Sequence, residues 1–101
     1  MAFIYKIKNN INNKCYVGKT EESIEKRFSQ HIRESKRERY KNRPLYRAFN
    51  KYGYENFSVE LIEETDNPEE KEIYWIDFLD TYSKGYNATK GGDGKNLLMK
   101  N

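Results

Sequence analysis

Five side chains of this sequence have the chemistry needed to bind a phosphate group and to move a proton beside it: Tyr5, Tyr16, Arg27, His31 and Glu72. A guanidinium donates two parallel hydrogen bonds to a phosphate, and an imidazole or a phenol can transfer a proton. A carboxylate can hold one hard divalent cation whose remaining positions are filled by water and substrate. These groups act together only if the fold brings them to one surface.

Each of these residues also has a purely structural interpretation. Tyrosines in strands are commonly core residues with hydrogen-bonded hydroxyls. Taken alone, Arg27 is a surface cation and His31 is a residue at the border of a helix. Glu72 alone is an ion-pair partner, because a carboxylate on a packed helix face needs a compensating charge. The combination therefore carries the functional interpretation, and no single residue does.

The first two predicted strands form a hairpin that carries both tyrosines. Residues 3 to 8 show the period-two pattern of a half-buried strand. Residues 14 to 18 are rich in strand formers and stop at a glycine. With residues 9 to 12 as the loop, Tyr5 falls opposite Tyr16, and both phenols leave the same face of the hairpin.

A helix after the hairpin carries the arginine and the histidine. Residues 20 to 22 provide a capping hydroxyl and then two acids that suit the positive end of a helix dipole. An apolar stripe with a spacing of four residues begins at Ile24. Arg27 and His31 are also four residues apart, so they lie along one border of this stripe, at the edge of the helix's contact with the sheet.

The remaining elements complete an α+β fold. Pro44 opens a second helix that ends at Gly53, and residues 57 to 61 alternate as a third strand. Asn67 starts a last helix, on whose packed side Glu72 lies. The predicted order is β-β-α-α-β-α, a small three-stranded antiparallel sheet flanked by helices.

The charge distribution favours a surface that faces a polyanion. The 101 residues carry a net charge of only +3, but nine lysines or arginines and two acids lie between Lys26 and Arg47. A solvated charged helix explains the same stretch equally well. One cysteine and one histidine cannot supply the usual ligands of a zinc site. No apolar run reaches membrane-spanning length and no secretory leader is present, so we expect a cytoplasmic protein.

The order and spacing of these residues resemble the GIY-YIG nuclease family, and most of all the catalytic domains of phage homing endonucleases. The two short motifs correspond to Phe-Ile-Tyr at residues 3–5 and Tyr-Val-Gly at residues 16–18. The resemblance extends to four polar positions: Arg27, His31, Glu72 and Asn87. Phe3 and Val17 depart from the family motifs, but neither change removes a reactive group.

The resemblance implies an endonuclease that hydrolyses phosphodiester bonds of DNA with one divalent metal ion, Mg²⁺ or Mn²⁺. Glu72 would hold the ion, Arg27 would stabilise the scissile phosphate, and Tyr5 would be the general base. A free phenol titrates near pH ~10, so Tyr5 needs a helper or a water-positioning partner. By the resemblance, Tyr16 and His31 are candidates to assist Tyr5 or to position the water, and Asn87 would brace the site.

The resemblance also implies a DNA-binding surface and a division of the chain. Its DNA-contacting residues are expected at the end of the hairpin and in the basic stretch: Gly18, Lys19, Lys26, Arg33, Lys36 and Tyr40. Residues 1–90 form the catalytic domain, and residues 91–101 form a flexible tail or the start of a linker to a separate C-terminal DNA-binding domain. Two alternatives stay open: a structure-selective repair or recombination nuclease of the same fold, and a non-catalytic nucleic-acid-binding module.

Overall fold

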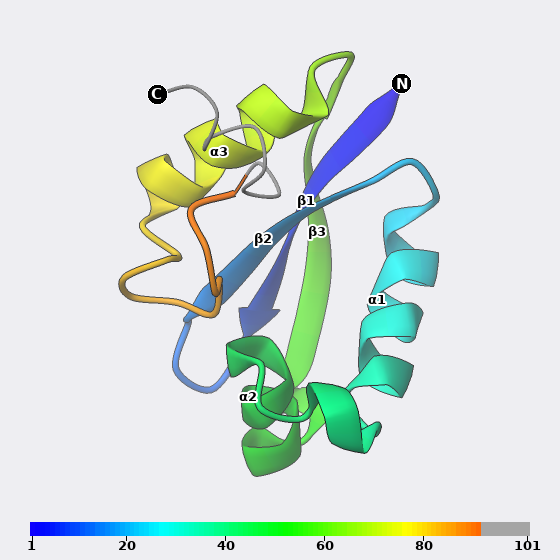
Figure 1. Cartoon of the computed structure of the whole chain (residues 1–101), viewed down its shortest axis with the longest axis vertical. Helices are drawn as coiled ribbons and strands as arrows, with labels where there is room; N and C mark the ends of the chain where they lie inside the picture. The colour runs from blue at the N-terminus through cyan, green and yellow to red at the C-terminus, as the bar shows by residue number, and fades with distance from the viewer. Residues whose placement is uncertain (92–101) are drawn as a thin grey trace.

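A three-stranded sheet with helices on both faces positions these residues (Figure 1). The computed structural model describes residues 1–91, so residues 92–101 of the predicted tail lie outside the described part. The helices and strands are β1 Ala2–Asn9, β2 Cys15–Thr20, α1 Ile24–Glu34, α2 Pro44–Tyr52, β3 Phe57–Thr65 and α3 Pro68–Leu79. The predicted order and antiparallel sheet are confirmed, with strand order β2-β1-β3. Within residues 1–91, no helix has the length and apolar character needed to cross a bilayer.

Both faces of the sheet are buried, because side chains on a strand alternate between its two sides. Tyr5 and Ile7 face the layer formed by α1 and α2, where most of the aromatic core lies. Ile4 and Val17 face the other way and pack against Ile76 of α3. Figure 1 shows α1 and α3 on opposite sides of the strands. Glu72 of α3 therefore comes from a different layer than Arg27 and His31 of α1.

The hairpin has a different register from the predicted one. Tyr5 pairs with Gly18, and Tyr16 lies opposite Ile7, so the prediction that the two tyrosines face each other directly is wrong. They are diagonal neighbours instead. The prediction that both phenols share one face is confirmed, since their ring centroids are 6.4 Å apart.

The register differs because the first strand continues through Asn9. The backbone N–H of Asn9 donates to the carbonyl of Lys14, which leaves residues 10 to 13 as the loop. The side chain of Asn9 is fully buried and donates to the hydroxyl of Tyr86 at 3.0 Å. Asn13 closes the loop with a φ of 68°, a conformation that asparagine adopts more readily than most residues.

The N-cap of the first helix lies three residues after its predicted position at Thr20. Ser23 is the N-cap residue, and its hydroxyl accepts from the backbone N–H of Lys26 at 3.1 Å. Thr20 instead ends β2, and its hydroxyl accepts from the backbone N–H of Glu22 in the intervening turn. The second strand therefore continues past Gly18, where the sequence pattern predicted its end.

The third strand is longer than predicted and contains a bulge. Tyr5 pairs with Leu61 and Ile4 pairs with Glu63, which leaves Ile62 as the extra residue. Leu61 is 50% exposed although it continues the apolar alternation of the strand. Simple period-two alternation therefore fails at the bulge of this edge strand.

Gly18 is required by the packing of Tyr5. A Cβ atom at this position would meet the Tyr5 hydroxyl and lie 2.5 Å from its Cζ atom. The phenol therefore lies across the backbone of β2, in space that any side chain at position 18 would occupy.

We expect Gly18→Ala to reduce the free energy of unfolding by roughly 1–3 kcal/mol, because it overpacks a buried contact. The penalty should shrink in a Tyr5→Leu background, where the clashing ring is absent. Urea unfolding of the parent, the two single variants and the double variant measures this coupling. An equal penalty in both backgrounds would show that Tyr5 is not the obstacle.

Candidate active site

Four of the predicted site residues meet on the face of the sheet that α1 covers. The hydroxyl of Tyr5 lies 2.8 Å from Nε2 of His31, and both side chains are buried. The ring of Tyr16 packs edge-on against the imidazole, with centroids 5.3 Å apart. Arg27 lies one turn before His31 in α1, and its positive charge lowers the pKa of the Tyr5 phenol against the larger effect of burial. The structure thus brings two phenols, an imidazole and a guanidinium together.

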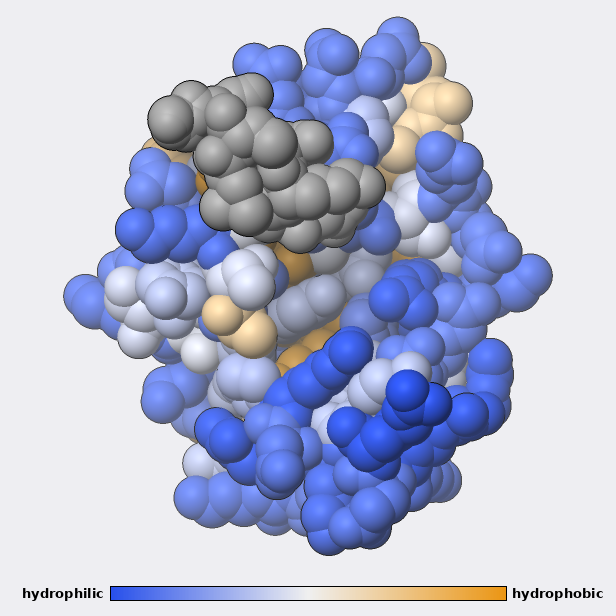
Figure 2. Space-filling model, viewed as in Figure 1, coloured by the Kyte–Doolittle hydropathy of each residue, from blue (hydrophilic) through white to orange (hydrophobic). Residues whose placement is uncertain are grey.

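A pocket of about 340 Å³ opens beside this cluster. Its lining includes Tyr16, Arg27, His31, Arg43 and Asn87. In the space-filling view, this face of the molecule is hollowed, and strongly hydrophilic residues lie below the hollow (Figure 2). The pocket can therefore hold a small polar group such as a phosphate between two arginines.

Burial sets the protonation states of the two phenols. Burial raises the pKa of Tyr5 far above the ordinary value of a phenol, and Tyr16 adds to the rise while Arg27 opposes it. Burial also raises the pKa of Tyr16 to about 12, with a further contribution from the negative charge of Glu72. Both phenols are protonated at neutral pH.

His31 is neutral for the same reason. Burial, together with the positive charges of Arg27 and Arg43, lowers the pKa of His31 to about 3. A neutral imidazole carries one N–H donor and one acceptor nitrogen. His31 can therefore accept the Tyr5 proton through one nitrogen while the other donates.

Glu72 approaches the cluster from the opposite layer. Its helix, α3, packs on the other face of the sheet, and the residue is 9% exposed. Nζ of Lys19 lies 3.4 Å from its Oε1 atom. Glu72 acts on Tyr16 electrostatically but does not line the pocket that contains Arg27 and His31. Residues 1–91 contain no group of three or more His, Cys, Asp or Glu side chains arranged to hold a metal ion.

Asn87 clamps the outer edge of β2. Its Nδ2 donates to the carbonyl of Val17 at 2.9 Å, and its Oδ1 accepts from the N–H of Val17 at 2.8 Å. The backbone N–H of Tyr86 donates to the carbonyl of Cys15. The asparagine therefore replaces a neighbouring strand at this edge and fixes the strand that carries Tyr16.

The predicted DNA-contacting residues are spread over several surfaces. Lys26 is exposed and pairs with Glu22 at 3.7 Å, whereas Lys19 pairs with Glu72. Arg33 and Tyr40 line a separate polar pocket at the C-terminal end of α1. The exposed Lys36 lies over the ring of Tyr54, and Gly18 lies buried under Tyr5.

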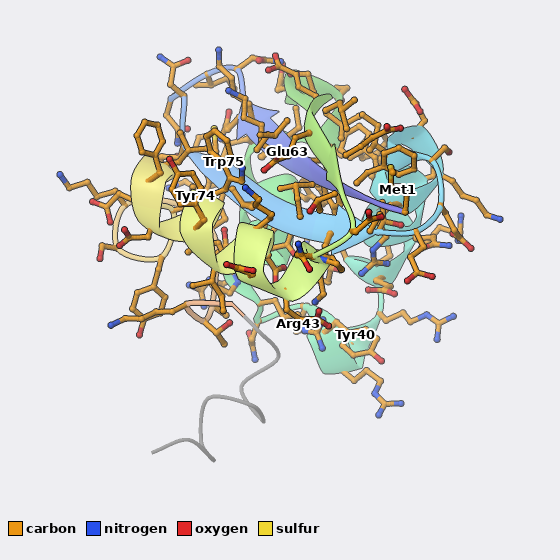
Figure 3. All side chains as sticks on the ribbon, turned by 90° about the horizontal axis from the view of Figure 1, so that it is seen from above. Met1, Tyr40, Arg43, Glu63, Tyr74 and Trp75 are labelled. Carbon is orange, nitrogen blue, oxygen red and sulfur yellow. The ribbon has the colours of Figure 1, made fainter. Side chains whose placement is uncertain are left out.

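Arg43 extends the cationic rim of the pocket toward Tyr40. Its guanidinium lies 4.5 Å from the centroid of the Tyr40 ring, and Figure 3 shows the two side chains next to each other. Cation–π contact of this kind holds a long flexible side chain in place. The guanidinium of Arg43 is therefore held in place by Tyr40 at the lining of the pocket.

Two residues of the site were not identified from the sequence. The hydroxyl of Tyr46 lies 2.7 Å from Nδ1 of His31 and donates to Oε1 of Glu34, also at 2.7 Å. Tyr46 is buried in the aromatic core, and the sequence analysis did not assign it to the site. The available signal was its position three residues before Phe49, on the side of α2 that faces the sheet.

The chain matches a known domain along most of its length. The model of the GIY-YIG catalytic domain matches residues 1–87. Intron-associated endonuclease 1 of Enterobacteria phage T4 is 36% identical to the chain over 88 residues. That alignment covers 83% of the chain but 35% of the relative, so the chain spans about a third of the relative's length.

Two solved structures have the same fold. The catalytic domain of the homing endonuclease I-TevI has a TM-score of 0.71 and 33% identity, over 88% of the chain and 99% of that structure. A mutant of the I-TevI catalytic domain has a TM-score of 0.77 and 34% identity, over 90% of the chain and 97% of that structure. The similarity thus covers the sheet, the helices and the segment that includes Asn87.

We expect Asn87→Ala to reduce the free energy of unfolding by about 2–4 kcal/mol, because both backbone groups of Val17 lose their partner in a buried position. The matched control is Asn50→Ala, which removes one 3.4 Å hydrogen bond from an exposed residue and should cost less than about 0.5 kcal/mol. Urea unfolding measures both. Equal effects of the two substitutions would contradict the clamp.

Stability should fall with decreasing pH because of His31. Its pKa is about 3 in the folded chain and 6.5 in the unfolded chain, so between these values the unfolded chain binds more protons. Between pH 7 and pH 5 this difference removes about 2 kcal/mol of stability. Urea unfolding at pH 7 and pH 5 measures this loss in the parent. In His31→Gln, the free energy of unfolding should change by about 2 kcal/mol less between the two pH values than in the parent. An identical pH dependence of parent and variant would mean that the imidazole is not held neutral.

Proposed function

The chain belongs to the GIY-YIG nuclease family, and from this premise we propose that it is a metal-dependent endonuclease that hydrolyses phosphodiester bonds of DNA. The observation that carries the proposal is the hydrogen bond between Tyr5 and His31 beside a pocket lined by Arg27. This arrangement combines a proton-transfer pair with a cation suited to phosphate. Because the substrate is DNA, we expect the enzyme to act in the cytoplasm.

In this proposal, Arg27 binds the scissile phosphate. Its guanidinium is half-buried and lines the pocket, where weaker solvation strengthens its interaction with an anion. Nη1 donates to Oε1 of Gln30 at 3.0 Å, which orients the side chain before substrate arrives. Arg43 also lines the pocket and would add a second positive charge where negative charge develops on the phosphate oxygens.

Tyr5 is the proposed general base, and His31 is its helper. Burial makes a standing phenolate costly, so Tyr5 accepts a proton from the attacking water as its own proton moves to His31. The geometry favours His31 over Tyr16 in this role, because Tyr5 is hydrogen-bonded to the imidazole and only packs against the Tyr16 ring. Tyr16 then positions water or phosphate, and Asn87 braces its strand.

Glu72 is the proposed ligand of a single Mg²⁺ or Mn²⁺. The residue suits the ion in chemistry, since it supplies a carboxylate oxygen that already has a cation, the ammonium of Lys19, at 3.4 Å. One protein carboxylate fits an ion that keeps most of its water, not a two-metal site. When bound, the ion would neutralise charge on the phosphate and on the leaving oxygen.

The DNA contacts proposed here lie on several surfaces of α1, the segment after it and the hairpin. Arg33 and Lys36 are exposed at the end of α1 and beyond it, and Tyr40 lies between them and the pocket-lining Arg43. Lys26 marks the other end of α1, while Gly18 and Lys19 lie next to the phenols and Glu72. Such contacts give affinity without sequence preference. Site preference would come from a separate C-terminal DNA-binding domain, as the greater length of the phage T4 relative suggests.

Plasmid cleavage with and without Mg²⁺ tests the proposed function. Arg27→Ala should lower the cleavage rate by about 10²–10³-fold, as expected when a transition-state donor is lost. Glu72→Gln should abolish the stimulation by Mg²⁺. Arg47→Ala and Glu70→Gln are the matched controls, because both are exposed residues outside the site. Undiminished cleavage by Arg27→Ala and Glu72→Gln would remove the proposed site.

A further inference from the structure

Three hydrogen bonds connect the buried phenol of Tyr5 to a carboxylate near the surface. Tyr5 bonds Nε2 of His31 at 2.8 Å, and Nδ1 of His31 bonds the hydroxyl of Tyr46 at 2.7 Å. The hydroxyl of Tyr46 in turn donates to Oε1 of Glu34 at 2.7 Å. The series joins β1, α1 and α2, and its inner three members are each at most 3% exposed.

The last bond fixes the direction of the others. A hydroxyl has one proton, and Tyr46 gives it to a carboxylate, which can only accept. Toward His31, the oxygen of Tyr46 must therefore accept, so Nδ1 of His31 carries the hydrogen. Nε2 is then the bare nitrogen and accepts from the hydroxyl of Tyr5. All three hydrogen bonds are therefore donated in the same direction, from Tyr5 toward Glu34.

We propose that Tyr46 and Glu34 are positioning residues that hold His31 as its Nδ1–H tautomer and carry the proton of Tyr5 to the surface. The proposal rests on the function proposed above. In the step, water gives a proton to Tyr5 as the Tyr5 O–H bond breaks and an Nε2–H bond forms on His31. The Nδ1 proton passes to the oxygen of Tyr46, and the former hydroxyl proton of Tyr46 passes to Glu34. The net change is one proton moved from water to a carboxylate.

The surroundings of His31 explain why the proton should not stay there. The titratable and charged groups around the imidazole come from the two hairpin strands, its own helix and the start of α2: Tyr5, Tyr16, Arg27, Arg43 and Tyr46. Two of these groups are cations, and burial removes the water that would solvate an imidazolium. A path onward to a negative group therefore lowers the energy of the transfer.

Glu34 is suited to release the proton. Its side chain is 33% exposed, in contrast to the buried members before it. It lines a polar surface pocket together with Gln30 and Arg33. Water that reaches this pocket can take up the proton, which returns Glu34 to its charged form without opening the aromatic core. His31 then carries its hydrogen on Nε2, and the starting tautomer returns when protons move back along the same three hydrogen bonds.

Nitrogen-15 NMR of the imidazole tests the tautomer directly, because His31 is the only histidine in the chain. We expect the parent to show an Nδ1–H imidazole at neutral pH. Tyr46→Phe should shift the population toward Nε2–H, whereas Tyr52→Phe, on the same helix and outside the relay, should leave it unchanged. Glu34→Ala supplies the same test at a half-exposed position if Tyr46→Phe does not fold. An Nε2–H imidazole in the parent, or an unaltered tautomer in the variant, would overturn the proposal.

Cleavage kinetics test the second half of the relay. Tyr46→Phe should lower kcat by about tenfold or more, part of the roughly 10²–10⁴-fold that a positioned base contributes, with unchanged affinity for DNA. Glu34→Gln should keep the tautomer, since an amide oxygen still accepts from Tyr46, but should alter the pH profile of kcat. Absence of cleavage by the parent would contradict the proposed function alone. Unchanged kcat in Tyr46→Phe, with an active parent, would overturn the relay.

Discussion

The imidazole of His31 is hydrogen-bonded on both sides, to a phenol of the sheet through Nε2 and to a phenol of α2 through Nδ1. Because the ring is buried, each of its nitrogens must keep its partner, and the price of losing one is an unsatisfied polar atom in the core. These two bonds therefore fix the rotation of the ring and the distance between three elements. The packing of Tyr16 and the opening of the pocket follow from that arrangement.

The site separates neutral groups in its interior from charged groups at its rim. Burial opposes ionisation of both tyrosines and of the imidazole, while Arg27 and Arg43 stand where the pocket begins. A phosphate that enters the pocket would contact these cations and would offset the lowering of the His31 pKa that they cause. The same arginines that suppress a positive charge on His31 in the empty site would thus be partly neutralised by substrate.

Periodicity and composition predicted the helices and strands well, but they predicted the pairing register of the strands poorly. The apolar stripe of α1 and the proline and glycine that bound α2 are local signals, and each appears where predicted. The loop of the hairpin contains several asparagines, any of which suits a turn. In the observed register Asn9 is the last residue of β1, and its buried side chain bonds Tyr86, which is 77 positions away in the chain. No local pattern records such a contact, and the same holds for the bond between His31 and Tyr46.

The sequence also did not predict on which face of the sheet each site residue lies. The sequence indicated that Glu72 lies on a packed helix face but not which side of the sheet that helix covers. Gly18 was interpreted as a strand end or a substrate contact, whereas its role in the structure is to make room for Tyr5. Residue identity thus predicted the members of the site, and packing decided how they meet.

The clamp of Asn87 on Val17 has a consequence for biosynthesis. The hairpin is translated first, and the residues that cover its outer edge are translated more than sixty positions later. A nascent chain that still ends before residue 87 presents an unpaired strand and an unfixed Tyr16, whatever else has folded. Ribosomes that stall or terminate early would therefore release fragments with an unassembled catalytic face, and only a nearly finished domain would become able to cut.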